Sequence, residues 1–214
     1  MSSLPRHTPQ PASSCPHGPV VRAAHADAEV LSQVIADAFG DLPQSRWLIP
    51  DDGARRVILP GYFRICVEHA MASGVVHTTA GRAAAALWLP AGEGTAGLPD
   101  GYDEQLAAVT GPWVQRFRVF DATLNRNHPA GPAHHHLVIL AVRPDRQGQG
   151  TGSQLLRAHH QILDQHGTPA YLEAATLRTT RLYQRHGYAI QPGGPFCLPG
   201  GRPAMWPMWR EPHR

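Results

Sequence analysis

The stretch "VRPDRQGQGTGSQLL" (142–156) constrains the fold of this chain more than any other feature. It follows the strongest strand pattern in the sequence, "HHHLVILAV" (134–142), and runs directly into a helical pattern. Gly148, Gly150 and Gly152 stand at the turn between the two. Free backbone amides at the start of a helix favour an anion, and glycine lets the backbone approach it closely. The pattern therefore predicts an α/β domain with a phosphate-binding loop at this turn.

Two common phosphate-binding loops do not match these residues. A P-loop requires a lysine, and all 19 basic residues of this chain are arginines. A dinucleotide-binding GxGxxG loop requires a third glycine where this chain has Ser153, and its acidic partner would be Glu173, inside a strand. An ordinary tight turn between a strand and a helix remains the structural alternative.

Hydrophobic periodicity predicts strands and helices on both sides of the loop. Before it we expect a strand at 20–24, a helix from Asp27 to Phe39 ended by Gly40, a loop at 41–52, a helix at 54–73 that Pro60 kinks or splits, and a hairpin at 74–90. After it we expect a helix ended by Gly167, a strand at 170–176, a helix at 179–187, a strand from 188, and a final strand at 203–210. Pro207 would require an edge position or a bulge in that last strand.

An insertion at 91–133 interrupts this alternation. A short helix is expected in "YDEQLAAV" (102–109), and a second begins at Pro112. Trp113, Phe117, Phe120 and Leu124 share one face of the second helix. This aromatic face is interpreted either as core packing or as the wall of a substrate pocket.

Composition and charge exclude several classes of protein. The 214 residues predict a single domain over 19–214, preceded by a Pro- and Ser-rich flexible tail at 1–18. The arginines are dispersed, so no nucleic acid is expected as a partner. No apolar run is long enough to span a membrane, no secretory signal is visible, and three widely spaced cysteines suit a reducing compartment. We therefore expect a cytoplasmic protein.

Two blocks of this sequence resemble the GCN5-related N-acetyltransferase (GNAT) superfamily. Its motif A has the core Q/R-x-x-G-x-G/A, which Gln147, Gly150 and Gly152 match. The downstream segment "YLEAATLRTTRLYQRHGYAI" resembles the C-terminal sequence block of the family, and its residues are most similar to those of the puromycin N-acetyltransferase branch. The resemblance covers roughly residues 20–191. It implies an α/β (α+β) GNAT fold, with a mixed, twisted central sheet flanked by helices on both faces.

The resemblance also implies acetyl-coenzyme A as co-substrate. Its pyrophosphate would lie on the backbone amides of the glycine loop, and its pantetheine arm would pair like an extra strand with main-chain groups of Leu140 and Val142. Thr179 stands where the family often has an asparagine that contacts the same arm, which puts that contact in doubt. The expected cofactor-binding residues are Leu140, Ala141, Val142, Gln147, Gly148, Gln149, Gly150, Thr151, Gly152, Ser153 and Thr179.

Three side chains are candidates for the chemistry. Tyr183 matches the general acid of the family, which protonates the coenzyme A sulfur. Glu173 lies in an apolar strand, where a lone carboxylate would have a raised pKa, and some relatives have a glutamate at the matching place. It is either a general base or an ion-pair partner of Arg178 or Arg181. His136 is the other candidate base, and strand alternation predicts that it shares a face with Val138, Leu140 and Val142. His134 and His135 are interpreted as solvent-exposed residues at the start of the strand.

No metal is expected, because adjacent strand histidines alternate between faces and cannot converge on one ion. The sequence thus predicts an enzyme that transfers acetyl from acetyl-coenzyme A to a primary amine of a small molecule by direct attack in a ternary complex. A protein N-terminal or lysine acetyltransferase and a non-catalytic acyl-coenzyme A-binding module are the alternatives. A homodimer is compatible with the sequence, and the acceptor amine is not identified by it.

Overall fold

The computed structural model describes residues 18–92 and 98–213, so most of the tail expected at 1–18 lies outside the described residues. One mixed sheet organises the fold, with the strand order β1-β2-β3-β4-β5-β8-β6 and with β7 paired to β8. Only the β4–β5 pairing is parallel among the described strands. The strands are β1 (Val20–Arg22), β2 (Val75–Thr79), β3 (Ala84–Ala91), β4 (His134–Val142), β5 (Ala170–Ala174), β6 (Ala189–Ile190), β7 (Phe196–Cys197) and β8 (Ala204–Arg210).

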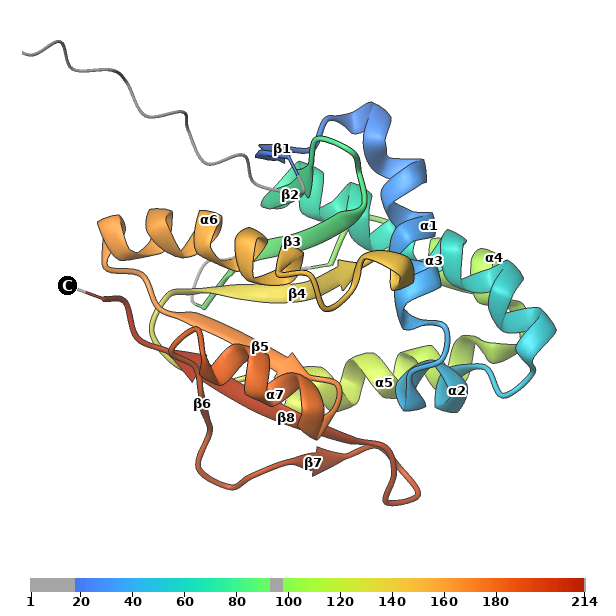
Figure 1. The fold of residues 1–214 in the computed structure, drawn as a ribbon. Helices are drawn as coiled ribbons and strands as arrows, with labels where there is room; N and C mark the ends of the chain where they lie inside the picture. The colour runs from blue at the N-terminus through green and yellow to red at the C-terminus, as the bar shows by residue number, and fades with distance from the viewer. Residues whose placement is uncertain (1–17, 93–97, 214) are drawn as a thin grey trace, which may run out of the picture.

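Helices cover both faces of the sheet, which confirms the predicted fold class (Figure 1). They are α1 (Ala28–Phe39), α2 (Pro43–Leu48), α3 (Asp52–Ser73), α4 (Tyr102–Thr110), α5 (Val114–Asn127), α6 (Thr151–His166) and α7 (Leu177–Gln184). Three short 3-10 turns occupy His25–Asp27, Gly111–Trp113 and Pro144–Arg146. No helix in the described part of the chain is long and apolar enough to cross a bilayer.

Two buried clusters fill the space between these layers. One packs α1, α3, α4 and α5 against the sheet and includes Leu87 and Ile139, while the other packs α6 and α7 against it and includes Trp88 and Leu172. Figure 1 shows α6 running across β3 and β4, and α7 lying over β5 and β8. Phe117 of α5 is fully buried in the first cluster, so the aromatic face of the insertion packs in the core.

β4 and β5 separate shortly after they begin to pair. Their parallel register joins only His135 to Ala170 and His136 to Tyr171. Beyond His136, β4 continues to Val142 beside β3, while β5 continues beside β8. Figure 1 shows the two strands diverging toward the end of β4 that leads into the glycine loop. One edge of β4 therefore has no partner among the described strands over residues 137–142.

A β-bulge at Val138 lies immediately after the last β4–β5 pair. Trp88 of β3 pairs with Leu137 and Leu87 pairs with Ile139, so Val138 has no partner on β3. A bulge adds one residue and reverses the side-chain alternation that follows it. Leu140 and Val142 consequently pack with the α6 cluster, whereas His136 faces Tyr171 and Glu173. The expectation that His136 shares a face with Leu140 and Val142 was wrong for this reason.

Three prolines behave differently from the sequence expectation. The expected loop at 41–52 contains α2, which begins at Pro43, a favourable position because the first helical amide has no partner. Pro60 lies inside α3 without splitting it. Pro207 lies in a strand with neighbours on both sides, but its carbonyl accepts from Gln191 N–H at 2.9 Å on the β6 side. The nitrogen of Pro207 faces the same side as its carbonyl. On that side β8 pairs with β6 at 208–209 and with β7 at 204–205, so the missing N–H of Pro207 breaks no strand pairing.

Candidate active site

The glycine loop leaves several backbone amides unpaired at the start of α6. Gly148 and Gly150 have positive φ angles of 75° and 91°, which only glycine adopts at low cost. The N–H groups of Gly148, Gly150 and Gly152 donate to no other residue of the described chain. The hydroxyl of Thr151 is buried and also lacks a partner among the described residues. Such unpaired donors at a helix N-terminus fit a phosphate or pyrophosphate group.

Polar side chains of the loop form hydrogen bonds with neighbouring parts of the protein. Gln147 Nε2 donates to the carbonyl of Val142 at 3.0 Å, and Gln149 Nε2 donates to that of Asp145 at 3.4 Å. Ser153 Oγ lies 2.9 Å from Nε2 of His186. The side chains of these three expected binding residues thus make contacts within the protein, and the open groups of the loop are main-chain amides.

The open edge of β4 offers main-chain groups beside the loop. Arg143 N–H donates to Ala83 O on the β3 side at 2.9 Å. Since backbone direction alternates along a strand, the N–H and C=O groups of Leu140 and Val142 face the other edge, where β5 has turned away. Those of Ala141 face β3, and its side chain is buried in the α1–α3 cluster. The open edge fits an extended ligand at Leu140 and at the N–H of Val142, whose carbonyl already accepts from Gln147, but not at Ala141.

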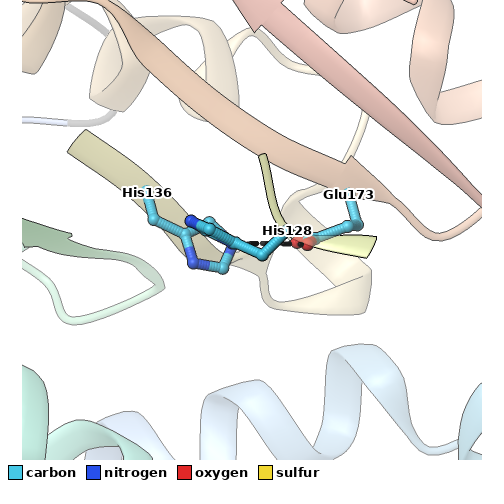
Figure 2. Close-up of side chains that lie close together, drawn as sticks. All are labelled: His128, His136 and Glu173. Atoms are coloured by element: carbon cyan, nitrogen blue, oxygen red, sulfur yellow. Dashed lines mark hydrogen bonds and ion pairs between the residues drawn. The ribbon is translucent and has the colours of Figure 1, made fainter. Parts of the chain in front are cut away.

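His136 and Glu173 form a hydrogen-bonded pair at the branch point of β4 and β5. His136 Nε2 lies 2.8 Å from Oε2 of Glu173, whose side chain is 5% exposed (Figure 2). An ionised carboxylate can only accept, so Nε2 carries the hydrogen and a neutral His136 has its lone pair on Nδ1. Nδ1 makes no hydrogen bond within the described residues. The two sequence candidates for the base are therefore in direct contact.

A second histidine, His128, faces the other oxygen of the same carboxylate. Its Nδ1 lies 4.0 Å from Glu173 Oε1, an oxygen that is buried and has no hydrogen-bond partner among the described residues (Figure 2). His128 Nε2 lies 3.1 Å from Nε2 of His134, and His134 Nδ1 lies 2.8 Å from the carbonyl of Pro132.

The hydrogen positions in this chain of contacts follow from the carbonyl at its end. The Pro132 carbonyl only accepts, so His134 Nδ1 must carry a hydrogen. A neutral His134 then accepts through Nε2, and His128 donates through its own Nε2. His128 Nδ1 is left with a bare lone pair that faces the partnerless oxygen of Glu173. Two electron-rich atoms thus face one another 4.0 Å apart, while the phenol of Tyr171 also acts to lower the pKa of this carboxylate.

Burial controls the charge states of these groups. Burial is the main cause that lowers the pKa of His128 to about 4, and it also lowers the pKa of His134. Burial acts to raise the pKa of Glu173, but His136 and His128 act against it, and the net shift is downward. The raised pKa expected for a lone carboxylate was wrong because Glu173 has histidine partners. At neutral pH the cluster holds an anionic Glu173 beside neutral His128 and His134.

The three adjacent histidines divide between the two faces of β4, as expected. His135 Nδ1 lies 3.0 Å from Nε2 of His159 on the α6 side, opposite to His134 and His136. The interpretation of His134 as solvated was wrong, because its side chain is 1% exposed and packs against Tyr171 and Trp209.

Tyr183 lies on the α6–α7 side of the sheet. Its ring is buried against Tyr188, with ring centroids 5.8 Å apart, and burial raises the pKa of its hydroxyl. That hydroxyl makes no hydrogen bond with any described residue. Thr179 uses its hydroxyl to donate to Thr176 O at 2.8 Å in the N-cap of α7. The hydroxyl of Thr179 is therefore engaged in the cap of α7.

Sequence reasoning missed His128 and Tyr171, which complete the pocket around Glu173. Tyr171 lies with its ring 4.8 Å from that of His128 and 5.4 Å from that of His136. Strand alternation could have found Tyr171, because it is two residues from Glu173. His128 gave no such signal, since it caps the C-terminus of α5 and only the tertiary fold brings it to β5.

Comparison with known proteins bears out the resemblance to the GNAT superfamily over residues 119–190 and the fold over most of the chain. Residues 119–190 match the acetyltransferase (GNAT) domain family. The chain is similar to the crystal structure of a histone acetyltransferase HPA2 and related acetyltransferase from Corynebacterium glutamicum, with a TM-score of 0.70 and 23% identity, covering 92% of this chain and 97% of that one.

Two structures of amine acetyltransferases share the fold at lower identity. Arylalkylamine N-acetyltransferase 2 from Aedes aegypti has a TM-score of 0.59 and 11% identity, covering 91% of this chain and 98% of that one. The polyamine N-acetyltransferase of Drosophila melanogaster, which forms N-acetylagmatine, has a TM-score of 0.53 and 16% identity, covering 89% and 96%. At these identities the likeness establishes the fold alone.

Proposed function

We propose that this chain, which carries a GNAT domain and has the GNAT fold, is an acetyl-coenzyme A-dependent N-acetyltransferase that acts on a primary amine of a small molecule. One observation carries the proposal. The His136–Glu173 pair lies at the point where β4 leaves β5, at one end of the open edge of β4, and the loop with free amides follows the other end of that strand. A base, an extended-ligand site and an anion site thus adjoin one opening in the sheet.

Binding of the co-substrate is assigned to main-chain groups. The amides of Gly148, Gly150 and Gly152, with the buried hydroxyl of Thr151, would hold the pyrophosphate. The open edge of β4 at Leu140 and Val142 would hold the pantetheine arm. When bound, acetyl-coenzyme A supplies a thioester carbonyl that an amine can attack.

Proton removal from the amine is assigned to His136. Nδ1 of His136 is free to accept a proton, and Glu173 fixes the tautomer through its hydrogen bond to Nε2. The anionic carboxylate also stabilises the imidazolium that forms. Glu173 is thus the positioning partner and His136 the base.

Proton donation to the leaving sulfur is assigned to Tyr183. A phenol whose pKa is raised by burial is fully protonated at neutral pH, and its hydroxyl has no partner in the described chain that would hold its hydrogen. The acid lies on the α6–α7 side and the base on the other side of the sheet, so the two would reach the reacting atoms through the opening between β4 and β5.

A small-molecule acceptor is favoured because the base lies in a confined cluster of rings. His128, His136 and Tyr171 enclose Glu173 within ring-to-ring distances of about 5 Å. A protein N-terminus or lysine would have to extend a flexible chain into this cluster.

Free-thiol release from acetyl-coenzyme A tests the proposal. The purified chain would be assayed with arylalkylamines, polyamines and peptides that carry a free N-terminus or a lysine. We expect turnover with at least one small amine, and Glu173→Gln should lower kcat by tenfold or more. Turnover with peptides alone would favour a protein acetyltransferase. Binding of acetyl-coenzyme A without turnover on any amine would favour the non-catalytic module.

A further inference from the structure

The side chains of His128, His136 and Glu173 together make a set of three donors, and His128 has no role in the proposed acetyl transfer. One ligand atom from each lies within 4.8 Å of the others. The three residues come from different segments: the C-terminus of α5, the start of β4, and β5. Figure 2 shows both imidazole rings turned toward the carboxylate of Glu173.

We propose that these three side chains form a binding site for one divalent transition-metal ion of the zinc class. Two imidazole nitrogens and one carboxylate oxygen are a donor set that suits Zn²⁺ and leaves a fourth position for water. Mg²⁺ and Ca²⁺ prefer oxygen ligands, and only one carboxylate belongs to this cluster. The site is distinct from the "HHH" triple rejected from the sequence, because only His136 of that triple takes part.

The hydrogen-bond chain from Pro132 prepares His128 for this role. Because His134 accepts from His128 Nε2, the lone pair of His128 lies on Nδ1 and faces Glu173. A metal-bound histidine usually donates its second ring N–H in this way, which fixes its tautomer and orientation. Glu173 Oε1 is buried and accepts no hydrogen bond from the residues that the structure describes, so a cation at this position would satisfy both atoms at once.

Three donor atoms that lie within 4.8 Å of one another can reach a small ion after side-chain shifts of up to about 1.4 Å. Zn–N and Zn–O bonds are each about 2.0–2.1 Å, so a tetrahedral ion would separate two of its ligands by about 3.4 Å. His128 Nδ1 and Glu173 Oε1 are 4.0 Å apart, so a closure of about 0.6 Å is needed. His136 Nε2 is 2.8 Å from Oε2, so this pair would open by about 0.6 Å, and the hydrogen on Nε2 would pass to Nδ1 through solvent so that the neutral ring binds the ion through Nε2.

Occupation of this site would have a consequence for the proposed function. The ion would bind the same carboxylate and the same imidazole that the reaction needs as base, so zinc would inhibit acetyl transfer. This consequence rests on the proposed function, whereas the binding of zinc does not.

Isothermal titration of Zn²⁺ into the chelator-treated, dialysed full chain tests the site without any turnover. We expect a high-affinity event that is absent from His128→Ala and from Glu173→Gln, or at least tenfold weaker in each. His166→Ala is the matched control, because it removes an exposed histidine that bonds only within α6, and it should leave that event unchanged. Equal binding by all four proteins, or no such event in the wild type, would overturn the proposal.

The absorption spectrum of Co²⁺ bound to the wild type gives a second readout that does not depend on the folding of a variant. We expect d–d bands of a low-coordinate nitrogen and oxygen site, without thiolate charge-transfer bands and with displacement by Zn²⁺ but not by Mg²⁺. A spectrum of hexaaqua cobalt, or one with thiolate bands, would contradict the site. Zinc binding without acetyl transfer would refute the proposed function alone, and acetyl transfer without zinc binding would refute this inference alone.

Discussion

The ring of Tyr183 packs in the core, but its hydroxyl makes no hydrogen bond in the described chain and is not among the side-chain oxygens that are closed off from solvent. Its hydroxyl therefore contributes little to stability in the ligand-free protein. In the proposed reaction the hydrogen of this hydroxyl would go to the leaving sulfur.

Replacement of Tyr183 by phenylalanine should separate these two roles. We expect kcat for acetyl transfer to fall by about 10- to 1000-fold, since a general acid contributes on this order, while the melting temperature stays within about 2 °C of the wild type. Free-thiol release and thermal melting measure the two quantities. An unchanged kcat would show that the hydroxyl is not the acid.

Glu173 shows what can and cannot be learned about a residue from sequence. A carboxylate in an apolar strand required a partner, and the sequence offered Arg178 and Arg181 as one choice and a catalytic role as the other. The structure gives histidines instead, His136 at 2.8 Å and His128 at 4.0 Å. His136 could be named in advance because it lies in a strong strand pattern, whereas the approach of His128 depends on where α5 ends.

At the scale of elements, the strand–loop–helix unit was the best predicted part of the fold. The patterns at 134–142 and 151–166 were long and periodic, and positive φ angles at Gly148 and Gly150 agree with the role given to glycine. The bulge at Val138 could not be read from the sequence, because an apolar strand looks the same with or without an extra residue. The extra residue, Val138, places Leu140 and Val142 on the opposite face of the sheet from His136.

The N-cap of α7 holds the helix that carries Tyr183. Thr176 Oγ1 accepts from Thr179 N–H at 3.1 Å. Thr176→Ala should lower the free energy of unfolding by about 1 kcal/mol, since a lost threonine cap costs this much. Thr176→Asn keeps an acceptor and should recover most of the loss. Urea unfolding measures both, and an equal loss in the two variants would mean that the cap is not the cause.

For the whole molecule, buried histidines predict a loss of stability in mild acid. Burial lowers the pKa of His159 to about 2 and of His160 to about 3, and their side chains are 1% and 5% exposed. In the unfolded chain both bind a proton near pH 6.5. Below that pH the two histidines bind protons in the unfolded state but stay neutral in the folded state. Acid therefore lowers the free energy of unfolding, by about 1.4 kcal/mol for each histidine at pH 5.5.

Urea unfolding at pH 7.5 and at pH 5.5 measures this effect. We expect the free energy of unfolding to be lower at pH 5.5 by at least about 2 kcal/mol. His160→Gln cannot be protonated, so its loss between the two pH values should be smaller than that of the wild type. Equal stability at both pH values would show that these histidines are not buried neutral in solution.

The central claim is that the glycine loop and the open edge of β4 bind acetyl-coenzyme A, and titration calorimetry tests it most directly. Gly150→Ala forces a side chain onto a φ of 91° at the loop, while Gly167→Ala imposes a similar strain on a φ of 63° at the other end of α6. We predict one acetyl-coenzyme A bound per chain, at least tenfold weaker binding by Gly150→Ala, unchanged affinity in Gly167→Ala, and no binding of NAD or ATP. Binding of NAD or ATP instead, or equal affinity in both variants, would contradict the account.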